Sequence, residues 1–245
     1  MKYYRLTPWD TKALNLKTAE LLYLDELTTE DEFEKVLKEM INTLKSKEVK
    51  FVYTRIDSQN NFAKHLLQSN NFYFSECSIS LVKKKVQKYV SVKCPKIDFL
   101  NFDIKDLLVL KNIAKNSFKY SRFHEDPFIY ESSACLRYFL WIDDLIKQNA
   151  DIKVAKKGNR IIGFSIQKNS TEESKSQLIL AGCSLGDEIF VKSLWNEILL
   201  YNKSLGFSRI ETMISGSNIG VMNVYNYFNF TTQKTLFGFH KFINK

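Results

Sequence analysis

The sequence predicts a mixed α/β protein of the α+β type with two domains, each a mostly antiparallel sheet flanked by helices. Apolar residues recur at helical spacing in some segments and alternate with polar residues in others, as in half-buried strands. The length of 245 residues suits two small domains. A lysine-rich connector interrupts the pattern after residue 82, and we therefore place the domains at residues 1–92 and 93–245.

The first domain is expected to alternate strands and helices. Thr28 or Thr29 caps a predicted helix that ends near Lys45, and the acidic residues after the cap suit the positive end of the helix dipole. The other expected elements are a strand at 49–55, a helix at 60–70, a half-buried strand at 72–82 and a basic strand or connector at 83–95.

The second domain shows a clearer pattern. Lys157-Gly158-Asn159 lies between two apolar segments and predicts a hairpin turn. The polar segment 121–127, which contains a proline, separates two helices and is expected to be a loop. The expected elements are helices at 103–117, 132–148, 186–204 and 218–228, and strands at 151–156, 160–168, 177–182, 209–214 and 232–243.

Composition excludes several classes of protein. With 44% hydrophobic and 26% charged residues, the chain is neither disordered nor fibrous. Its four cysteines lie far apart, so neither a metal site nor a disulfide framework is expected. No apolar run approaches the roughly 18 residues that a membrane span needs, and the first residues lack the apolar centre of a signal peptide. We therefore expect a cytoplasmic protein.

The formal charge of +9 indicates an anionic partner. The one dense cluster, Lys83, Lys84, Lys85 and Lys88, is interpreted as a solvated connector face, since no nucleic-acid recognition motif accompanies it. A nucleic-acid-binding module is a competing hypothesis that depends only on this charge and on the many aromatic residues.

All eight glycines lie at or after residue 158, so any glycine-dependent phosphate loop must lie in the second domain. There, an expected strand leads through the segment 182–186, Gly-Cys-Ser-Leu-Gly, into a helix, and the N–H groups of such a turn can hold a diphosphate. Asn218 opens the next helix. Tyr225 lies seven residues later, about two helical turns on, and shares a helix face with Asn218.

These pieces carry a resemblance to a known family. The turn at 182–188 and the helix pattern Asn218…Tyr225…Asn229-Phe230 resemble the GNAT superfamily of acyl-CoA-dependent N-acyltransferases. The match narrows to the bacterial TDP-fucosamine acetyltransferase group through three further segments, namely Ser121-Arg-Phe-His-Glu-Asp-Pro127, Trp141-Ile142 and Pro8-Trp9-Asp10.

The resemblance implies two GNAT-like domains, of which the N-terminal copy is degenerate and binds no coenzyme. It implies an enzyme that transfers an acyl group from acyl-CoA, either acetyl-CoA or a larger acyl-CoA, to the amine of a dTDP-linked amino-dideoxy sugar for surface glycan or lipopolysaccharide synthesis. The implied partners are this nucleotide sugar and coenzyme A, without nucleic acid or a membrane span, and a homodimer is compatible with the family.

Two positions depart from the superfamily pattern. The phosphate loop keeps Gly186 but lacks the leading Gln or Arg, and Asp187 is electrostatically unfavourable for a diphosphate. We therefore expect a weakened phosphate loop. Asn229 stands where the family has glycine, a small change because Asn tolerates the left-handed conformation at a helix end.

The resemblance also implies roles for individual residues. Tyr225 is the expected catalytic residue, a general acid that protonates the coenzyme sulfur, and Asn218 is expected to hold the pantetheine arm while it caps its helix. N–H groups at 178–182 are expected to polarise the thioester carbonyl. The expected coenzyme-binding residues are Ala181, Gly182, Cys183, Ser184, Leu185, Gly186, Asp187, Glu188, Asn218 and Tyr225.

Arg122, His124 and Asp126 are expected to contact the substrate. His124 is the only nearby candidate that titrates near neutrality, so it is a base for the amine, a contact to the sugar or coenzyme, or a structural residue. Trp9 and Asp10 are expected to brace the N-terminal domain, and contact with the nucleotide is the alternative for them. Alternatives to the leading hypothesis keep the fold but use another small amine or a larger acyl group such as hydroxybutyryl, or bind acyl-CoA without catalysis.

Overall fold

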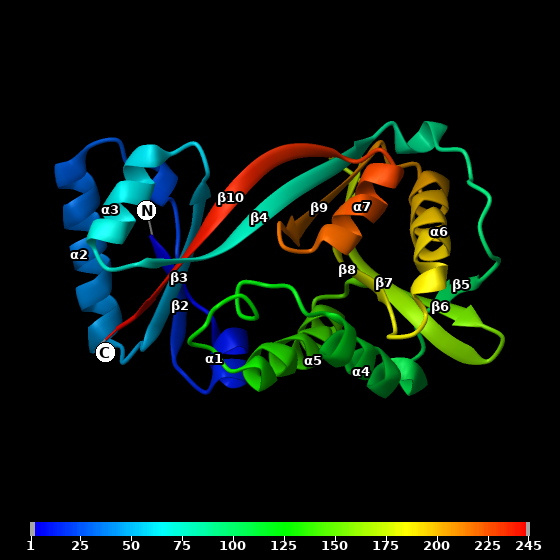
Figure 1. The fold of residues 1–245 in the computed structure, drawn as a ribbon, viewed down its shortest axis with the longest axis horizontal. Coiled ribbons are helices and arrows are strands. Elements are labelled where there is room, and N and C mark those ends of the chain that lie inside the picture. Colours follow the sequence, from blue (N-terminus) through cyan, green and yellow to red (C-terminus); the bar gives the residue numbers. More distant parts are fainter. Residues whose placement is uncertain (1–2, 244–245) are drawn as a thin grey trace. The chain divides into compact units, whose positions relative to one another are not determined.

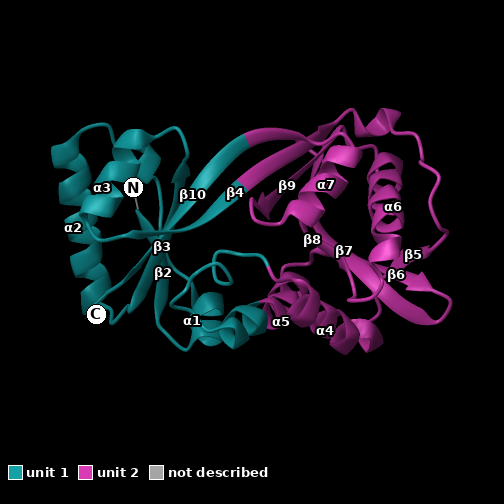
Figure 2. Cartoon of the chain, viewed as in Figure 1, with its two compact units in different colours: residues 1–78, 120–137, 234–245 teal, residues 79–119, 138–233 magenta. Residues whose placement is uncertain are grey.

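A computed structural model describes residues 3–243 of the chain. The chain forms two compact units (Figure 2), each with helices against a sheet, which confirms the predicted fold class. Unit 1 comprises the residues up to 78, residues 120–137 and those from 234 onward, and unit 2 comprises 79–119 and 138–233. The boundary between the two compact units therefore does not fall at residue 92, because unit 1 also includes segments that come later in the sequence. The assignment of 1–92 and 93–245 as two domains stays a prediction.

Unit 1 contains a mixed sheet with strand order β1-β2-β3-β10-β4. β2 and β3 are parallel, whereas β1 with β2 and β3 with β10 are antiparallel. The elements that lie in this unit, or begin or end in it, are β1 (Tyr4–Leu6), α1 (Pro8–Leu14), β2 (Thr18–Leu21), η1 (Leu24–Glu26), α2 (Glu30–Ser46), β3 (Phe51–Asp57), α3 (Asn61–Ser69), β4 (Tyr73–Lys84), α5 (Glu131–Lys147) and β10 (Thr231–Phe242) (Figure 1).

Unit 2 continues from β4 with the strand order β4-β9-β8-β7-β6-β5. The strands from β5 to β8 are antiparallel to their neighbours, and β8 with β9 is parallel. The further elements of this unit are η2 (Val86–Lys88), β5 (Asp98–Asn101), η3 (Ile104–Asp106), α4 (Leu107–Ser117), β6 (Asp151–Lys157), β7 (Arg160–Ser170), β8 (Lys175–Cys183), η4 (Glu188–Phe190), α6 (Val191–Ser204), β9 (Arg209–Ser215) and α7 (Ile219–Tyr227).

Helices cover both faces of the sheet in unit 1. On one face, α2 and α3 pack through residues such as Phe33 and Leu67 against strand residues such as Val52. On the other face, Phe51 and Tyr53 pack against Phe123 and Ala134. The segment around the predicted loop 121–127 therefore supplies a core of unit 1, although it lies far from β3 in the sequence.

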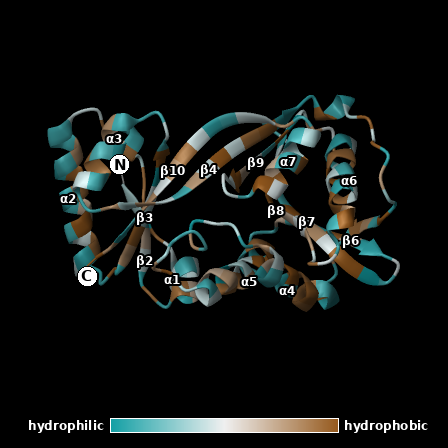
Figure 3. Ribbon diagram, viewed as in Figure 1, coloured by the Kyte–Doolittle hydropathy of each residue, from teal (hydrophilic) through white to brown (hydrophobic). Residues whose placement is uncertain are grey.

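Two cores also enclose the sheet of unit 2. One core joins the strands to α6 and α7, and the other joins them to α4 and α5. The long apolar stretches of β7 and α4 are visible as brown ribbon in Figure 3. Leu178 belongs to the first core and Leu180 to the second, although residues two apart in a regular strand face the same way.

A β-bulge in β8 explains this change of face. Ile166 of β7 pairs with Leu180 and the next residue, Gln167, pairs with Leu178, so Ile179 is an extra residue in β8. An extra residue disrupts the ladder locally and redirects the side chains beyond it. The bulge lies at the point where the candidate site begins.

Close packing of β7 on β8 predicts a strong effect of a methyl group at Gly163. A Cβ atom there would lie 2.7 Å from the carbonyl oxygen of Gly182. We expect Gly163→Ala to lower the free energy of unfolding by about 1–3 kcal/mol, because the backbone must shift. Chemical denaturation of both proteins measures this difference.

Gly220 provides the matched control, since a Cβ at this position in α7 meets its nearest atom at 3.9 Å. Gly220→Ala is expected to leave stability unchanged or to raise it by up to about 1 kcal/mol through helix propensity. Equal stability of Gly163→Ala and the unmodified protein would show that the backbone accommodates a Cβ at residue 163 without cost.

No helix among residues 3–243 is both long enough and apolar enough to cross a membrane.

Candidate functional site

Two parallel strands separate in the middle of unit 2. β8 and β9 pair from Lys175 with Arg209 to Leu178 with Thr212, and their ladder ends there. Beyond this point β8 continues to pair with β7 as far as Cys183, while β9 runs on to Ser215. The edge of β8 that faces β9 therefore offers backbone donors and acceptors to an extended ligand from residue 179 onward.

The bulge at Ile179 lies directly after the last paired residue, Leu178. Bulges take backbone groups out of the ladder and are frequent beside functional sites. Of the predicted oxyanion donors at 178–182, Leu178 still pairs with β9, and residues 179–182 lie in a strand segment that is free of β9. The apolar run Leu178-Ile179-Leu180 breaks strict alternation and is the sequence signal that could have indicated the bulge.

The turn after β8 holds most of the predicted coenzyme residues. Gly186 has a φ of +86°, a left-handed conformation that favours glycine. The Gly186 N–H donates to Glu188 Oε1 at 3.0 Å. Leu185 and Glu188 are exposed, whereas Asp187 is only 3% exposed. The turn leads into η4 and then α6, which begins at Val191 rather than at residue 186 as predicted, and binding of a diphosphate by this turn stays a prediction.

The negative charge of Asp187 is balanced by a neighbouring side chain. Arg160, at the start of β7, donates two hydrogen bonds to its carboxylate at 2.5 and 2.6 Å, and Ser184 donates a third. The ion pair with Arg160 holds the pKa of Asp187 below its usual value. The expectation that Asp187 disfavours a diphosphate therefore needs correction, since Arg160 compensates its charge.

Tyr225 of α7 is buried, with 3% of its surface exposed. Its ring lies 5.5 Å from that of Trp195 and 4.7 Å from that of Phe230, edge to face in both cases. Burial raises the pKa of Tyr225 to about 12, and polar contacts with Thr212 and Trp195 act in the opposite direction. The phenol is therefore protonated at neutral pH.

Thr212 links Tyr225 to the separating strands. Its hydroxyl donates to the carbonyl of Leu178 at 2.9 Å, at the last paired position of β8 and β9. The Tyr225 hydroxyl contacts this threonine, so it lies close to the point where the two strands part. Sequence analysis did not identify Thr212, because its relevance follows only from the strand register.

Asn218 caps α7, as the sequence predicts. Its Oδ1 atom accepts the N–H of Val221 at 3.1 Å. Because the cap uses the oxygen, the amide nitrogen is the part of Asn218 that can donate to a ligand.

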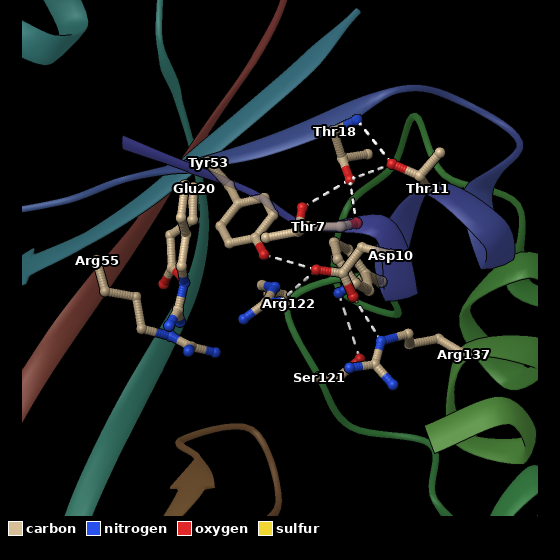
Figure 4. A network of polar contacts seen from close by, with 12 residues as sticks. Thr7, Asp10, Thr11, Thr18, Glu20, Tyr53, Arg55, Ser121, Arg122 and Arg137 are labelled. Carbon is tan, nitrogen blue, oxygen red and sulfur yellow. Dashed lines mark hydrogen bonds and ion pairs between the residues drawn. The ribbon is translucent and has the colours of Figure 1, made fainter. Parts of the chain in front are cut away.

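The predicted substrate residues belong to unit 1, where Arg122 joins a polar network around Asp10. Figure 4 shows Tyr53, Arg122 and Arg137 directed at the Asp10 carboxylate, with donor distances of 2.6, 3.2 and 2.5 Å. Asp10 is fully buried. The Arg122 guanidinium also lies 4.1 Å from the centroid of the Tyr53 ring. Asp10 thus braces the N-terminal part of the chain against the segment that follows α4.

Three threonines fix the position of Asp10. Thr7 precedes α1, and its hydroxyl lies 2.7 Å from that of Thr18 on β2. Thr18 also hydrogen-bonds the carbonyl of Thr7 and the hydroxyl of Thr11. These contacts attach the first turn of α1 to the sheet and orient the carboxylate.

Asp126 is buried among polar partners of unit 1. It accepts hydrogen bonds from Tyr73 at 2.8 Å and from the N–H of Phe128, and lies 2.6 Å from Nδ1 of His240. His240 is fully buried, and burial lowers its pKa. His240 is thus part of the buried core of unit 1, where it contacts Asp126. The contact of Asp126 with a substrate stays a prediction.

Both ring nitrogens of His124 have neighbours. Nδ1 lies 2.9 Å from the Ser121 hydroxyl, and Nε2 lies 3.6 Å from Sγ of Cys135. These contacts favour the structural role among the alternatives given for His124, because a base or substrate contact requires one of them to break.

The predicted site residues therefore fall into two groups. Residues 181–188, Asn218 and Tyr225 lie in unit 2, and Arg122, His124 and Asp126 lie in unit 1. Within residues 3–243, no group of three or more His, Cys, Asp or Glu side chains is placed to hold a metal ion.

Comparisons with known proteins identify the fold. No family model and no curated protein matches the sequence. Among solved structures, a GCN5-related N-acetyltransferase from Sphaerobacter thermophilus matches with a TM-score of 0.68 and 12% identity over 99% of this chain and 76% of the other. A tandem GNAT protein from the clavulanic acid biosynthesis pathway matches with a TM-score of 0.61 and 9% identity, over 93% of this chain and 76% of the other.

A GCN5-related glucosamine N-acetyltransferase region of a fungal multi-domain protein matches with a TM-score of 0.68 and 10% identity, over 93% of this chain and 30% of the other. Identities this low establish the fold alone. The similarity to a tandem protein agrees with two GNAT-like domains. The chain thus has the fold of GCN5-related N-acetyltransferases, and the finer resemblance to the TDP-fucosamine group stays a prediction.

Proposed function

We propose that this protein is an N-acyltransferase that moves an acyl group from acyl-CoA to the amine of a small acceptor. The observation that carries the proposal is the separation of β8 from β9 beyond Leu178 and Thr212, with the protonated Tyr225 at that point. A thioester arm lying along the edge of β8 would bring its sulfur to the phenol.

Residues of unit 2 fit such a coenzyme. The unpaired edge of β8 suits the amides of the pantetheine arm, and the amide nitrogen of Asn218 is a further donor. The turn at 184–188 precedes a helix, whose N-terminal end favours a diphosphate. Arg160, whose side chain is 63% exposed, neutralises the Asp187 carboxylate beside this turn.

In the proposed reaction a neutral amine attacks the thioester carbonyl, so that a C–N bond forms and the C–S bond breaks. N–H groups of the bulged segment of β8 stabilise the oxyanion. Tyr225 donates its proton to the leaving thiolate, and the nitrogen loses a proton to water or to a base. Burial of Tyr225 keeps the acid protonated, as the step requires.

For the acceptor we propose a dTDP-linked amino-dideoxy sugar, and contacts of Arg122, His124 and Asp126 with it stay a prediction from the sequence. The support is the resemblance of 121–127 to that family and the fold similarity to a glucosamine N-acetyltransferase region. Release of free thiol with a panel of dTDP-amino sugars and acyl-CoAs tests this acceptor against other small amines and against larger acyl groups such as hydroxybutyryl.

Binding of coenzyme A, measured by calorimetry on the full chain, tests the function itself. We expect a one-to-one complex. Absence of binding at saturating coenzyme concentrations would overturn the acyltransferase proposal, whatever the acceptor.

Glu188 offers a test of the diphosphate position. Its carboxylate accepts a hydrogen bond from the Gly186 N–H and carries an exposed negative charge. We expect Glu188→Gln to strengthen coenzyme A binding by about fivefold at most, because the repulsion between one carboxylate and the diphosphate, partly screened by salt, is worth about 1 kcal/mol. Calorimetry at two salt concentrations measures the effect, which must shrink as salt increases.

Glu172→Gln, a charge removal in the turn between β7 and β8, is the control and should leave coenzyme affinity unchanged. Unchanged binding by Glu188→Gln would show that the diphosphate does not approach this turn, and weaker binding would contradict the expected repulsion.

A further inference from the structure

A lysine-lined groove in unit 2 lies at the end of β4, along η2 and at the C-terminal end of α7. Its volume is about 380 Å³. Its lining, which we call the lysine groove, comprises Lys83, Lys84, Lys85, Lys88, Tyr89, Val90, Val92, Tyr227, Phe228 and Asn229. None of these residues is among the predicted coenzyme or substrate contacts. The sequence interpretation of the four lysines as a solvated connector face did not anticipate a concave site.

Local structure places the four lysines along one groove. Lys83 and Lys84 end β4, and Lys85 has a left-handed φ of 57° that turns the chain into η2. Val86 and Tyr89 are buried on either side of Lys88. This turn directs the lysines of a strand end and of a short helix into one groove rather than onto alternate faces.

The groove is held in place by bonds to α6 and the turn that follows it. The N–H of Val86 donates to the carbonyl of Ser208, and the Gln87 side chain donates to that of Gly206. The Tyr89 hydroxyl donates to Asn196 at 2.9 Å, and Lys203 donates to the Tyr89 carbonyl. A wall anchored at so many points needs little ordering when a ligand binds.

The charge of the groove is not balanced within the described chain. The lining contains no carboxylate, and among residues 3–243 the side chains of the four lysines form no ion pair or hydrogen bond. The C-terminal end of α7 contributes only about half a negative charge. Burial without a carboxylate partner also lowers the pKa of Lys83. Four lysines that line one groove favour a ligand with several negative charges.

The volume of the groove and its apolar residues restrict the class of ligand that it can bind. A cavity of about 380 Å³ matches a small molecule rather than a duplex or a flat membrane surface. Val90 and Tyr227 are 78% and 47% exposed and give the groove an apolar flank. Lys192 lies 4.2 Å from the centroid of the Tyr227 ring and adds a fifth cation nearby.

We propose that the lysine groove binds the oligophosphate group of a small ligand. The chemistry is shared by free oligophosphate and by a nucleoside polyphosphate, whose base would lie on Val90 and Tyr227. This site is separate from the proposed coenzyme site and does not depend on the proposed function.

Calorimetric titration of the full chain with tripolyphosphate and with ATP tests the proposal. The groove variant carries Lys84→Gln, Lys85→Gln and Lys88→Gln. The control variant carries Lys45→Gln, Lys47→Gln and Lys50→Gln, which are exposed lysines of unit 1, so both variants lose three charges. We expect one-to-one binding that the groove variant weakens by about tenfold or more and the control variant by about twofold at most.

The two ligands distinguish the sources of the oligophosphate. Tighter binding of ATP identifies a nucleotide, and equal binding identifies free oligophosphate. Four results would overturn the proposal: no binding of either ligand, equal losses in both variants, binding of oligoribonucleotides or anionic vesicles without the small ligands, or an equal loss of coenzyme A affinity in the groove variant.

Discussion

Tyr225→Phe is expected to lower kcat for acyl transfer by about 100-fold or more, with little change in KM for the acyl-CoA. General acids contribute about 10² to 10⁴ to rate, and removal of the hydroxyl leaves the departing thiolate without its donor. The ring itself stays clamped between Trp195 and Phe230, so the fold should persist. Steady-state assays of thiol release measure both parameters, and thermal melting verifies the fold.

Tyr227→Phe is the matched control, since Tyr227 lies on the same helix but is exposed. It is expected to retain the full rate. The pKa of Tyr225 is raised, so its phenol stays neutral throughout the physiological range. Titration of this phenol should therefore not change kcat within that range. Unchanged acyl transfer by Tyr225→Phe would assign the proton to another donor.

Asp10→Asn is expected to destabilise the protein by about 3–5 kcal/mol. The substitution removes the charge that Arg122 and Arg137 share in a buried position, and breaking a buried ion pair leaves a poorly compensated charge. The hydroxyl of Tyr53 also loses its carboxylate acceptor. For a chain of this size the loss corresponds to a decrease in Tm on the order of 10 °C, which circular dichroism can follow.

Asp31→Asn makes the same chemical change at an exposed position in the first turn of α2. Its cost should not exceed about 1 kcal/mol, the size of a helix-dipole interaction. Similar Tm values for the two variants would show that the Asp10 network adds nothing to stability.

Elements that depend on neighbouring residues were predictable from the sequence. The Asn218 cap joins residues three apart, so the cap and the helix after it follow from a short segment. The helix at 132–148 was found at 131–147 and the strand at 209–214 at 209–215, because their apolar spacing is regular. The helix at 8–14 was not predicted, since it is short and lacks a side-chain cap.

Contacts between residues that lie far apart in the sequence were not predictable, because they depend on strand register and on how the chain folds back on itself. Arg160 reaches Asp187 across 27 positions only because β7 and β8 pair as they do. Arg137 and Asp10 are 127 positions apart, and nothing in either segment indicates the other. The lysine cluster was visible as charge, but its concave arrangement depends on the left-handed Lys85 and on the C-terminal end of α7.

The pairing of β3 with β10 has a consequence for biosynthesis. Residues 51–57 form a buried strand, and seven of its positions pair with residues 236–242. At about 5–20 residues per second, translation separates the two strands by on the order of ten seconds or more. During that interval the nascent strand has an open, largely apolar edge of the kind that promotes aggregation. Unit 1 can therefore close only after β10 has left the ribosome, and chaperones that shield strand edges should increase the yield of folded protein.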